Sequence, residues 1–231
     1  MSAIPRIVEV RQNILRRNDE AARALRERFR EAGVFVVSLV SSPGSGKTAF
    51  LERALALLLK EGYRPAALVG DLATENDAVR LARSGAPAKQ ITTGTVCHLE
   101  AAMVAGAIEG WNLADLDFLF IENVGNLVCP ASFDVGENLR VVLLSVTEGE
   151  DKPLKYPTIF NSADAAVVTK IDLAEAVEFD WGAAESSIAA VRPALPVLRV
   201  SSKTGAGMSG LIEFLKSCRA QSCPACPARA D

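Results

Sequence analysis

The chain has 231 residues, of which 49% are hydrophobic and 23% charged, and its formal net charge is −3. This composition is typical of a soluble globular protein, and the weak negative balance gives no reason to expect nucleic acid or an anionic membrane as a partner. The longest apolar runs, such as VFVVSLV at 34–40, are too short to span a bilayer. The first residues lack the apolar segment and cleavage site of a signal peptide, so we expect a cytoplasmic protein.

The first segment, residues 5–31, is predicted to form one amphipathic helix. Apolar side chains recur at helical spacing from Ile7 to Phe29. The arginines between them alternate with acids, which favours a solvated face of mixed charge over a basic patch for nucleic acid. We treat residues 1–32 as an N-terminal helical extension.

From residue 34 onward, short apolar runs alternate with helical segments. Strands are predicted at 34–40, 65–70, 117–123, 139–146, 164–170 and 196–200, and helices begin near Lys47 and Glu75. Strands that are buried on both faces and separated by helices indicate an α/β fold, with a mostly parallel central sheet flanked by helices. We assign residues 33–217 to this domain and expect residues 218–231, which are small, polar and Pro-containing, to be a flexible tail.

The segment SLVSSPGSGKT joins the first predicted strand to a helix. This is the P-loop arrangement, with Ser41 in place of the first glycine of the usual pattern. Loop amides and a helix N-terminus bind phosphate, Lys47 would reach the β- and γ-phosphates, and the Thr48 hydroxyl would ligate Mg²⁺. An ordinary Gly/Ser turn is the alternative, but the order strand, loop and helix argues against it. The predicted binding residues are Gly44, Ser45, Gly46, Lys47 and Thr48.

The tetrapeptide TKID at 169–172 indicates which base is bound. A carboxylate at Asp172 can accept hydrogen bonds from the ring N–H and the exocyclic amine of guanine, a donor pair that adenine lacks. Lys170 could cover the base with its aliphatic part, and Thr169 replaces the commoner asparagine of the guanine-specificity motif of GTPases. Ser202 and Lys203 in VSSKTG are similar to the second base-contacting loop of that class. Together these motifs predict GTP.

Two acids end predicted strands close to the P-loop. Asp71 ends AALVGD and Glu122 ends DFLFIE, positions that suit Mg²⁺ coordination and orientation of the attacking water. We predict Asp71 as a magnesium ligand beside Thr48, and Lys47, Asp71 and Glu122 as catalytic residues. Gly125 in ENVG corresponds to the γ-phosphate-sensing glycine of switch GTPases. The alternative for Asp71 is to begin the following helix.

Cysteine and histidine supply a candidate metal site. The five cysteines are an odd number in a chain without an export signal, which favours reduced thiols over disulfides. Cys97 and His98 are adjacent, and Cys129 follows shortly after Glu122. Thiolate and imidazole suit Zn²⁺ and Ni²⁺, and three ligands leave the coordination shell open. The alternative is that both cysteines are buried small hydrophobes and His98 caps a helix.

From about residue 33 to 217 the sequence resembles the HypB family of hydrogenase nickel-incorporation GTPases. The similar segments are SSPGSGKT, GDLATENDA, TTGTVCHLEAAM, FIENVGNLVCPASFDVGE, SVTEGEDKPLKYP, TKIDL and SSKTG. The resemblance implies a SIMIBI-class P-loop GTPase that is a homodimer when GTP is bound. It implies a metallochaperone that delivers nickel to the hydrogenase large subunit with other maturation proteins. It also implies that Cys97, His98 and Cys129 are the interfacial metal ligands.

Two features depart from or extend this pattern. The chain lacks the Cys-rich N-terminal nickel motif and the histidine-rich tract found in some members. Its tail instead holds Cys218, Cys223 and Cys226, which could bind Zn²⁺ or Ni²⁺ or have no function. The loop GEDKPLKYP lies, by resemblance, near the partner's nucleotide, where Lys152 or Lys155 could neutralise γ-phosphate charge in trans; we predict Lys152 as the catalytic residue.

These inferences predict a GTP-hydrolysing nickel metallochaperone with a slow intrinsic rate. The segment ENVGNLVC joins the γ-phosphate side of the nucleotide site to Cys129, so we expect nucleotide state and metal affinity to be coupled. The alternatives are a nickel or zinc storage protein that uses GTP only as a dimerisation switch, and a sister metallochaperone GTPase for urease or another metalloenzyme. A P-loop ATP-dependent kinase is a further alternative.

Overall fold

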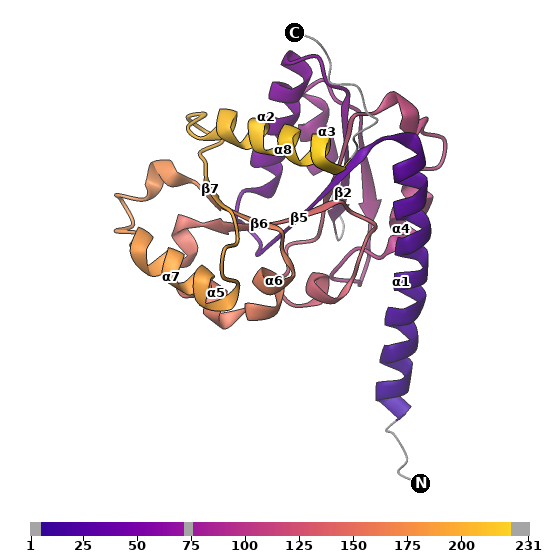
Figure 1. Ribbon diagram of the computed structural model, residues 1–231, viewed down its shortest axis with the longest axis horizontal. Coiled ribbons are helices and arrows are strands. Elements are labelled where there is room, and N and C mark those ends of the chain that lie inside the picture. Colours follow the sequence, from indigo (N-terminus) through magenta and orange to yellow (C-terminus); the bar gives the residue numbers. More distant parts are fainter. Residues whose placement is uncertain (1–5, 72–75, 223–231) are drawn as a thin grey trace.

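A seven-stranded parallel sheet forms the centre of the computed structural model, which describes residues 6–71 and 76–222 (Figure 1). The strand order is β3-β2-β4-β1-β5-β6-β7, and every pairing is parallel. The strands are β1 (Phe35–Ser41), β2 (Pro65–Asp71), β3 (Ala88–Thr92), β4 (Phe118–Glu122), β5 (Leu139–Ser145), β6 (Ala165–Thr169) and β7 (Val197–Arg199). The predicted α/β fold with a parallel sheet is therefore confirmed.

Helices cover both faces of this sheet. They are α1 (Arg6–Ala32), α2 (Lys47–Lys60), α3 (Asn76–Ala82), α4 (Ala101–Ala107), α5 (Lys152–Lys155), α6 (Pro157–Ser162), α7 (Trp181–Val191) and α8 (Met208–Ser222). Helices α2, α3 and α8 pack with one face of the sheet in a first hydrophobic cluster, whereas α1, α4, α6 and α7 pack on the other face (Figure 1). Short 3-10 helices follow β4, β5 and β6, namely η2 (Cys129–Ser132), η3 (Val146–Glu148) and η4 (Ile171–Leu173).

Strand β3 is the one element of the sheet that the sequence did not predict. Of its five residues only Ile91 is buried, because β3 lies at the edge of the sheet. An edge strand with one buried side chain shows neither an apolar run nor a clear alternation. The six predicted strands all lie in the sheet.

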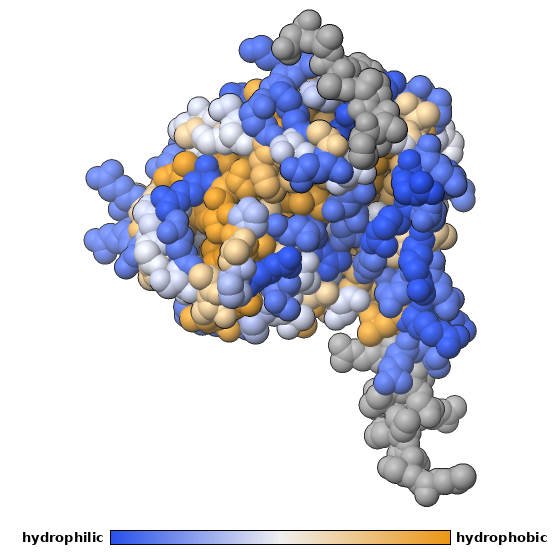
Figure 2. Space-filling view, viewed as in Figure 1, coloured by the Kyte–Doolittle hydropathy of each residue, from blue (hydrophilic) through white to orange (hydrophobic). Residues whose placement is uncertain are grey.

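The long helix α1 is anchored by its second half. Ala22, Leu25 and Phe29 are buried in the second hydrophobic cluster, against β1, β2, β4 and α4. The first half extends beyond the body of the molecule in Figure 1, and Figure 2 shows a largely hydrophilic outer surface along this helix. Asn18 donates to the carbonyl of Asp134 (2.8 Å) and accepts from the Ala101 amide (2.9 Å), so α1 braces the segments after Cys129 and after His98.

The last described helix, α8, continues past the predicted domain boundary at residue 217. It ends at Ser222, and the half-buried Cys218 packs against the first cluster. Cys218 is therefore part of a folded helix, while Cys223 and Cys226 lie outside the described residues. Within 6–71 and 76–222, no helix is both long enough and apolar enough to cross a bilayer.

The parallel topology positions the site. Strands β1, β2, β4 and β6 run in the same direction, and they end at Ser41, Asp71, Glu122 and Thr169. The carboxyl ends of parallel strands meet at one edge of the sheet, which is where ligands bind in open α/β folds.

Candidate nucleotide and metal sites

The P-loop follows β1 and leads into α2. Gly44 and Gly46 have φ values of 75° and 94°, which a side chain would strain, and Gly46 is the N-cap of α2. Lys47 folds back over the loop, and its ammonium group donates to the hydroxyl of Ser41 (2.8 Å). Ser41 is the residue that replaces the first glycine of the usual P-loop pattern. The amides of this loop and of the helix N-terminus form an anion-binding cradle.

Three oxygen-bearing side chains surround the phosphate end of the loop. Thr48 Oγ1 donates to Glu122 Oε1 (2.8 Å), and Asp71 lines the same cavity of about 370 Å³. Burial raises the pKa of Glu122 to about 7, against the opposing charge of Lys47. Glu122 Oε2 is buried and has no hydrogen-bond partner among the described residues. Hydroxyl and carboxylate oxygens are the donors that Mg²⁺ prefers, so these residues fit a magnesium ion.

A second cavity, of about 240 Å³, contains the predicted base-binding residues. Its lining includes Thr169, Lys170, Asp172, Ser202 and Lys203. Thr169 Oγ1 donates to the carbonyl of Ser45 (2.7 Å), and Lys170 Nζ donates to that of Gly44 (2.7 Å). The hydroxyl of Ser201 donates to Asp172 Oδ1 (2.6 Å) and so orients the carboxylate. The motif TKID is thus bound directly to the P-loop, with the threonine hydroxyl making one of the contacts.

Cys97, His98 and Cys129 lie together although 32 residues separate the two cysteines. One ligand atom of each residue lies within 4.8 Å of the other two, and the two sulfurs are 3.0 Å apart. The pair at 97–98 comes just before α4, and Cys129 begins η2. Both imidazole nitrogens of His98 are buried without a hydrogen-bond partner among the described residues. Burial lowers the pKa of His98, which favours the neutral form that binds metals.

The segment between Glu122 and Cys129 contacts both sites. A Cβ atom added at Gly125 would lie 2.9 Å from Pro43 Cα in the P-loop, so the two backbones are in close contact. Asn123 Oδ1 accepts from the Leu99 amide (3.0 Å), and Asn126 Nδ2 donates to the carbonyl of Cys97 (3.2 Å). Neither asparagine was predicted as a site residue, although both lie inside the segment ENVGNLVC.

Other residues of the site were also missed. Asp77 and Arg80 of α3 line the phosphate cavity, and Arg80 is paired with Glu52 of α2 (2.8 Å). The carboxylate of Glu148 contacts the Ser42 hydroxyl in the P-loop. Glu148 forms a capping box at η3, and the Ser-x-x-Glu spacing in SVTE is the signal that could have identified this turn.

The two lysines of the loop after η3 have different surroundings. Lys155 is paired with Asp151 (2.6 Å), whereas the ammonium group of Lys152 lies 5.4 Å from the centre of the Tyr156 ring. Within the described ranges, Lys152 forms no ion pair. Leu154, between them, is 52% exposed, so this short helix presents an apolar side chain and the exposed Lys155 to solvent, whereas Lys152 is half-buried.

The parallel sheet, the loop at the end of β1 and the motif TKID after β6 define a P-loop nucleotide-binding protein. The model of the CobW/HypB/UreG nucleotide-binding domain matches residues 35–199. The chain belongs to this family and, within it, to the HypB hydrogenase maturation factors.

Individual relatives agree with this assignment. The hydrogenase maturation factor HypB of Azotobacter chroococcum is 47% identical over 212 residues, 91% of this chain and 69% of that protein. The hydrogenase/urease maturation factor HypB of Helicobacter hepaticus is 43% identical over 218 residues, 93% of this chain and 89% of that protein. A crystal structure of HypB from Helicobacter pylori in complex with nickel superposes with a TM-score of 0.85 at 40% identity and covers 92% of this chain and 100% of that one.

Proposed function

We propose that this chain hydrolyses GTP and uses the nucleotide state to control delivery of nickel to the large subunit of nickel–iron hydrogenase. The observation that carries the proposal is the segment 122–129, which contacts the P-loop at one end and bears a cysteine of the Cys/His cluster at the other. The nickel bound by HypB of Helicobacter pylori supports nickel as the cargo. Other nickel-insertion maturation proteins would act with this chain.

For GTP binding, the proposed roles follow the two cavities. Asp172 would accept the guanine N–H donors, and Lys170 would cover the base. Lys47 and the loop amides would hold the phosphates. Thr48 and Asp71 would hold Mg²⁺, which supplies charge neutralisation at the β- and γ-phosphates when bound.

For hydrolysis, water attacks the γ-phosphorus and GDP leaves. Glu122 is placed at the cavity with one carboxylate oxygen free of hydrogen-bond partners among the described residues, so it can orient this water. Lys152 of the partner subunit would neutralise charge on the transferred phosphoryl group. This role suits Lys152 better than Lys155, because the latter is already paired with Asp151.

A homodimer would join two such sites. Val128, adjacent to Cys129, is 63% exposed, and Leu154, near Lys152, is 52% exposed. Single exposed apolar residues are common, but these two flank a metal ligand and a proposed trans lysine. Their burial in a GTP-bound dimer would bring Cys97, His98 and Cys129 of both subunits together.

The metal site is suited to transfer. Two thiolates and one imidazole leave a four-coordinate ion with an open position, which a further ligand can enter. The same donors suit Zn²⁺, so zinc competes with nickel at this site. A shift of Gly125 in response to the γ-phosphate would move Asn126, and with it the hydrogen bond to Cys97.

Single-turnover hydrolysis tests the catalytic part of the proposal. Lys47→Ala should abolish GTP hydrolysis, and hydrogenase activity in cells should fall with it, whereas Lys60→Ala at the exposed end of the same helix should leave both unchanged. ATP should not displace labelled GDP. A wild-type chain that binds GTP without hydrolysing it would contradict the proposal and favour a storage protein with a nucleotide switch.

Urease is a second candidate target. The Helicobacter hepaticus relative, of which this chain covers 89%, is a hydrogenase/urease maturation factor. Reconstituting nickel loading of each apoenzyme with purified chain separates the two, since delivery to hydrogenase alone would exclude the wider role.

A further inference from the structure

We propose that Phe133 orients the imidazole of His98, and that this ring contact sets the metal affinity of the Cys97–His98–Cys129 cluster. The inference rests on the proposed function of this cluster as a metal site. Phe133 is a positioning residue: it has no atom that binds metal, and it acts through the ring that it contacts.

The surroundings of His98 differ from those of an ordinary metal-ligating histidine. A metal-ligating imidazole usually donates its second ring N–H to a carboxylate or a carbonyl, and this hydrogen bond fixes the ring. Here neither nitrogen has a hydrogen-bond partner among the described residues. Glu100 Oε1 lies 3.6 Å from Nε2, which is within ion-pair distance but beyond hydrogen-bond range. The described residues therefore hold the ring without a hydrogen bond.

A ring contact between Phe133 and His98 takes the place of that hydrogen bond. The centre of the Phe133 ring lies 3.8 Å from the centre of the imidazole, at an interplanar angle of 34°. Aromatic pairs are normally separated by about 4.5–7 Å, so this is an unusually close contact between two tilted rings. Because the His98 side chain is only 12% exposed, a ring covering one face limits both its rotation and its access to water.

The backbone of Phe133 is anchored to the sheet through Arg140. It follows η2, which begins at Cys129, so one short segment carries a ligand and the ring that orients another. Arg140 Nη2 donates to the carbonyl of Phe133 (2.9 Å). Arg140 also pairs with Glu137 (2.6 Å), whose side chain is only 6% exposed and accepts from the Ser38 hydroxyl of β1 (3.1 Å).

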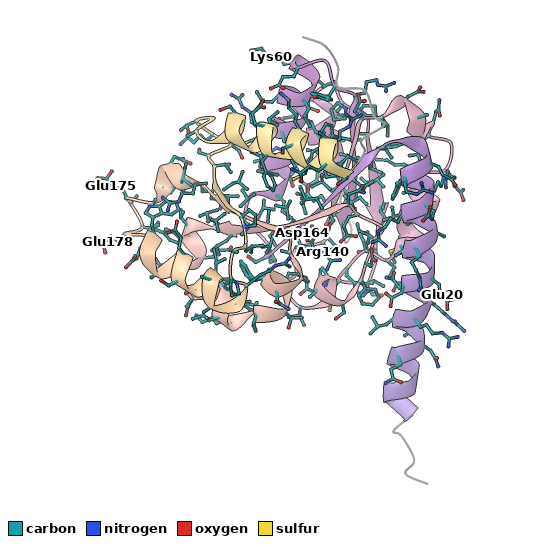
Figure 3. The ribbon with its side chains drawn as sticks, viewed as in Figure 1. Glu20, Lys60, Arg140, Asp164, Glu175 and Glu178 are labelled. Carbon is teal, nitrogen blue, oxygen red and sulfur yellow. The ribbon has the colours of Figure 1, made fainter. Side chains whose placement is uncertain are left out.

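These contacts connect the segment to the sheet. Arg140 lies on β5, and Figure 3 shows it beside Asp164, whose carboxylate accepts from the Arg140 amide (2.8 Å). The chain of contacts therefore runs from two central strands to the Phe133 backbone. An anchored backbone fixes the position from which the Phe133 ring reaches His98, which suits an orienting role.

The test compares Phe133→Leu, which keeps apolar volume but removes the ring, with Phe133→Tyr, which keeps the ring. Phe214→Leu on α8, also half-buried but packed in the first cluster, is the matched control. Competition with a chromophoric chelator gives the Ni²⁺ and Zn²⁺ affinities of each nucleotide-free protein. We expect Phe133→Leu to lower the Ni²⁺ and Zn²⁺ affinities about tenfold or more, as substitutions of residues that orient metal ligands typically do. The other two variants should bind both metals as the wild type does. GDP affinity should be unchanged in all three.

A second readout needs no metal. His98 is the only histidine of the chain, so its ring protons can be assigned directly by NMR. In the wild type, the ring current of Phe133 should move them upfield of their values in unfolded protein, and Phe133→Leu should abolish this shift. This measurement on the wild type remains decisive even if the leucine variant fails to fold.

The outcomes separate the inference from the proposed function. If His98→Ala keeps full metal affinity, the metal site itself is wrong. If His98→Ala loses affinity but Phe133→Leu does not, the positioning role is overturned. Equal losses in Phe133→Leu and Phe133→Tyr, or wild-type imidazole protons without an upfield shift, would also overturn it.

Discussion

Gly125→Ala tests the contact between the P-loop and the segment that carries Cys129. The new Cβ would lie 2.9 Å from Pro43 Cα and 3.0 Å from Pro43 N, well inside the optimum separation of about 3.5–4.0 Å. Gly125 does not have a positive φ, so the effect comes from this contact and not from backbone strain. Overpacking of this kind costs about 1–3 kcal/mol.

This overpacking cost should appear as a loss of nucleotide affinity. Without nucleotide the loop can move away from the added methyl group, whereas bound phosphate requires the loop amides in place. We therefore expect the affinity for a non-hydrolysable GTP analogue to fall by about 5- to 150-fold, because each cost of about 1.4 kcal/mol lowers an affinity tenfold. Titration with a fluorescent analogue measures it, with thermal unfolding to show that the variant is folded.

Gly106→Ala is the matched control. Gly106 lies in α4, where an added Cβ meets nothing within 4 Å. Alanine in a helix is favoured over glycine by up to about 1 kcal/mol, so this variant should bind normally and unfold at a slightly higher temperature. A Gly125→Ala protein that binds the analogue within twofold of the control would refute the argument.

Three further predictions concern single contacts. Thr169→Val removes the hydroxyl bound to the Ser45 carbonyl and should weaken GDP binding by about tenfold in a fluorescence titration, whereas Thr169→Ser should not. Lys152→Ala should slow single-turnover hydrolysis without changing GDP affinity, and an unchanged rate would exclude its trans role. Arg219→Leu breaks a buried pair with Asp117 (3.2 Å), which keeps its second partner Arg64, and should destabilise the fold by about 1.5–3 kcal/mol; calorimetry showing a wild-type Tm would contradict this.

Local patterns made most of the fold predictable. The inner strands carry apolar runs because helices cover both faces of the sheet, and that pattern is visible in sequence. The edge strand β7 was also predicted, because it still carries the apolar pair Val197 and Leu198. Strand β3 was not predictable, because an edge position needs only Ile91 to be apolar. The extent of α8 was underestimated for a similar reason: Cys218 and Arg219 look like the start of a polar tail, but both pack against the body.

The candidate site also contains residues that the sequence predicted and contacts that it could not predict. The P-loop residues are consecutive, so spacing alone identified them. The hydrogen bond from Thr169 to Ser45 spans 124 residues, and that from Asn126 to Cys97 spans 29. Phe133 carries no chemical signal of its own. Such contacts depend on tertiary distances, which one sequence does not contain, and the roles assigned to the site residues remain predictions.

The central claim is that the nucleotide state changes the affinity of the Cys/His cluster for metal. It is tested most directly by measuring Ni²⁺ binding to the wild-type chain with GDP and with a non-hydrolysable GTP analogue. A coupling free energy of about 1–3 kcal/mol predicts affinities that differ by about 5- to 150-fold, and a difference that disappears in Gly125→Ala. Equal Ni²⁺ affinities in the two nucleotide states would contradict the account, because a ligand that does not distinguish two states cannot shift the equilibrium between them.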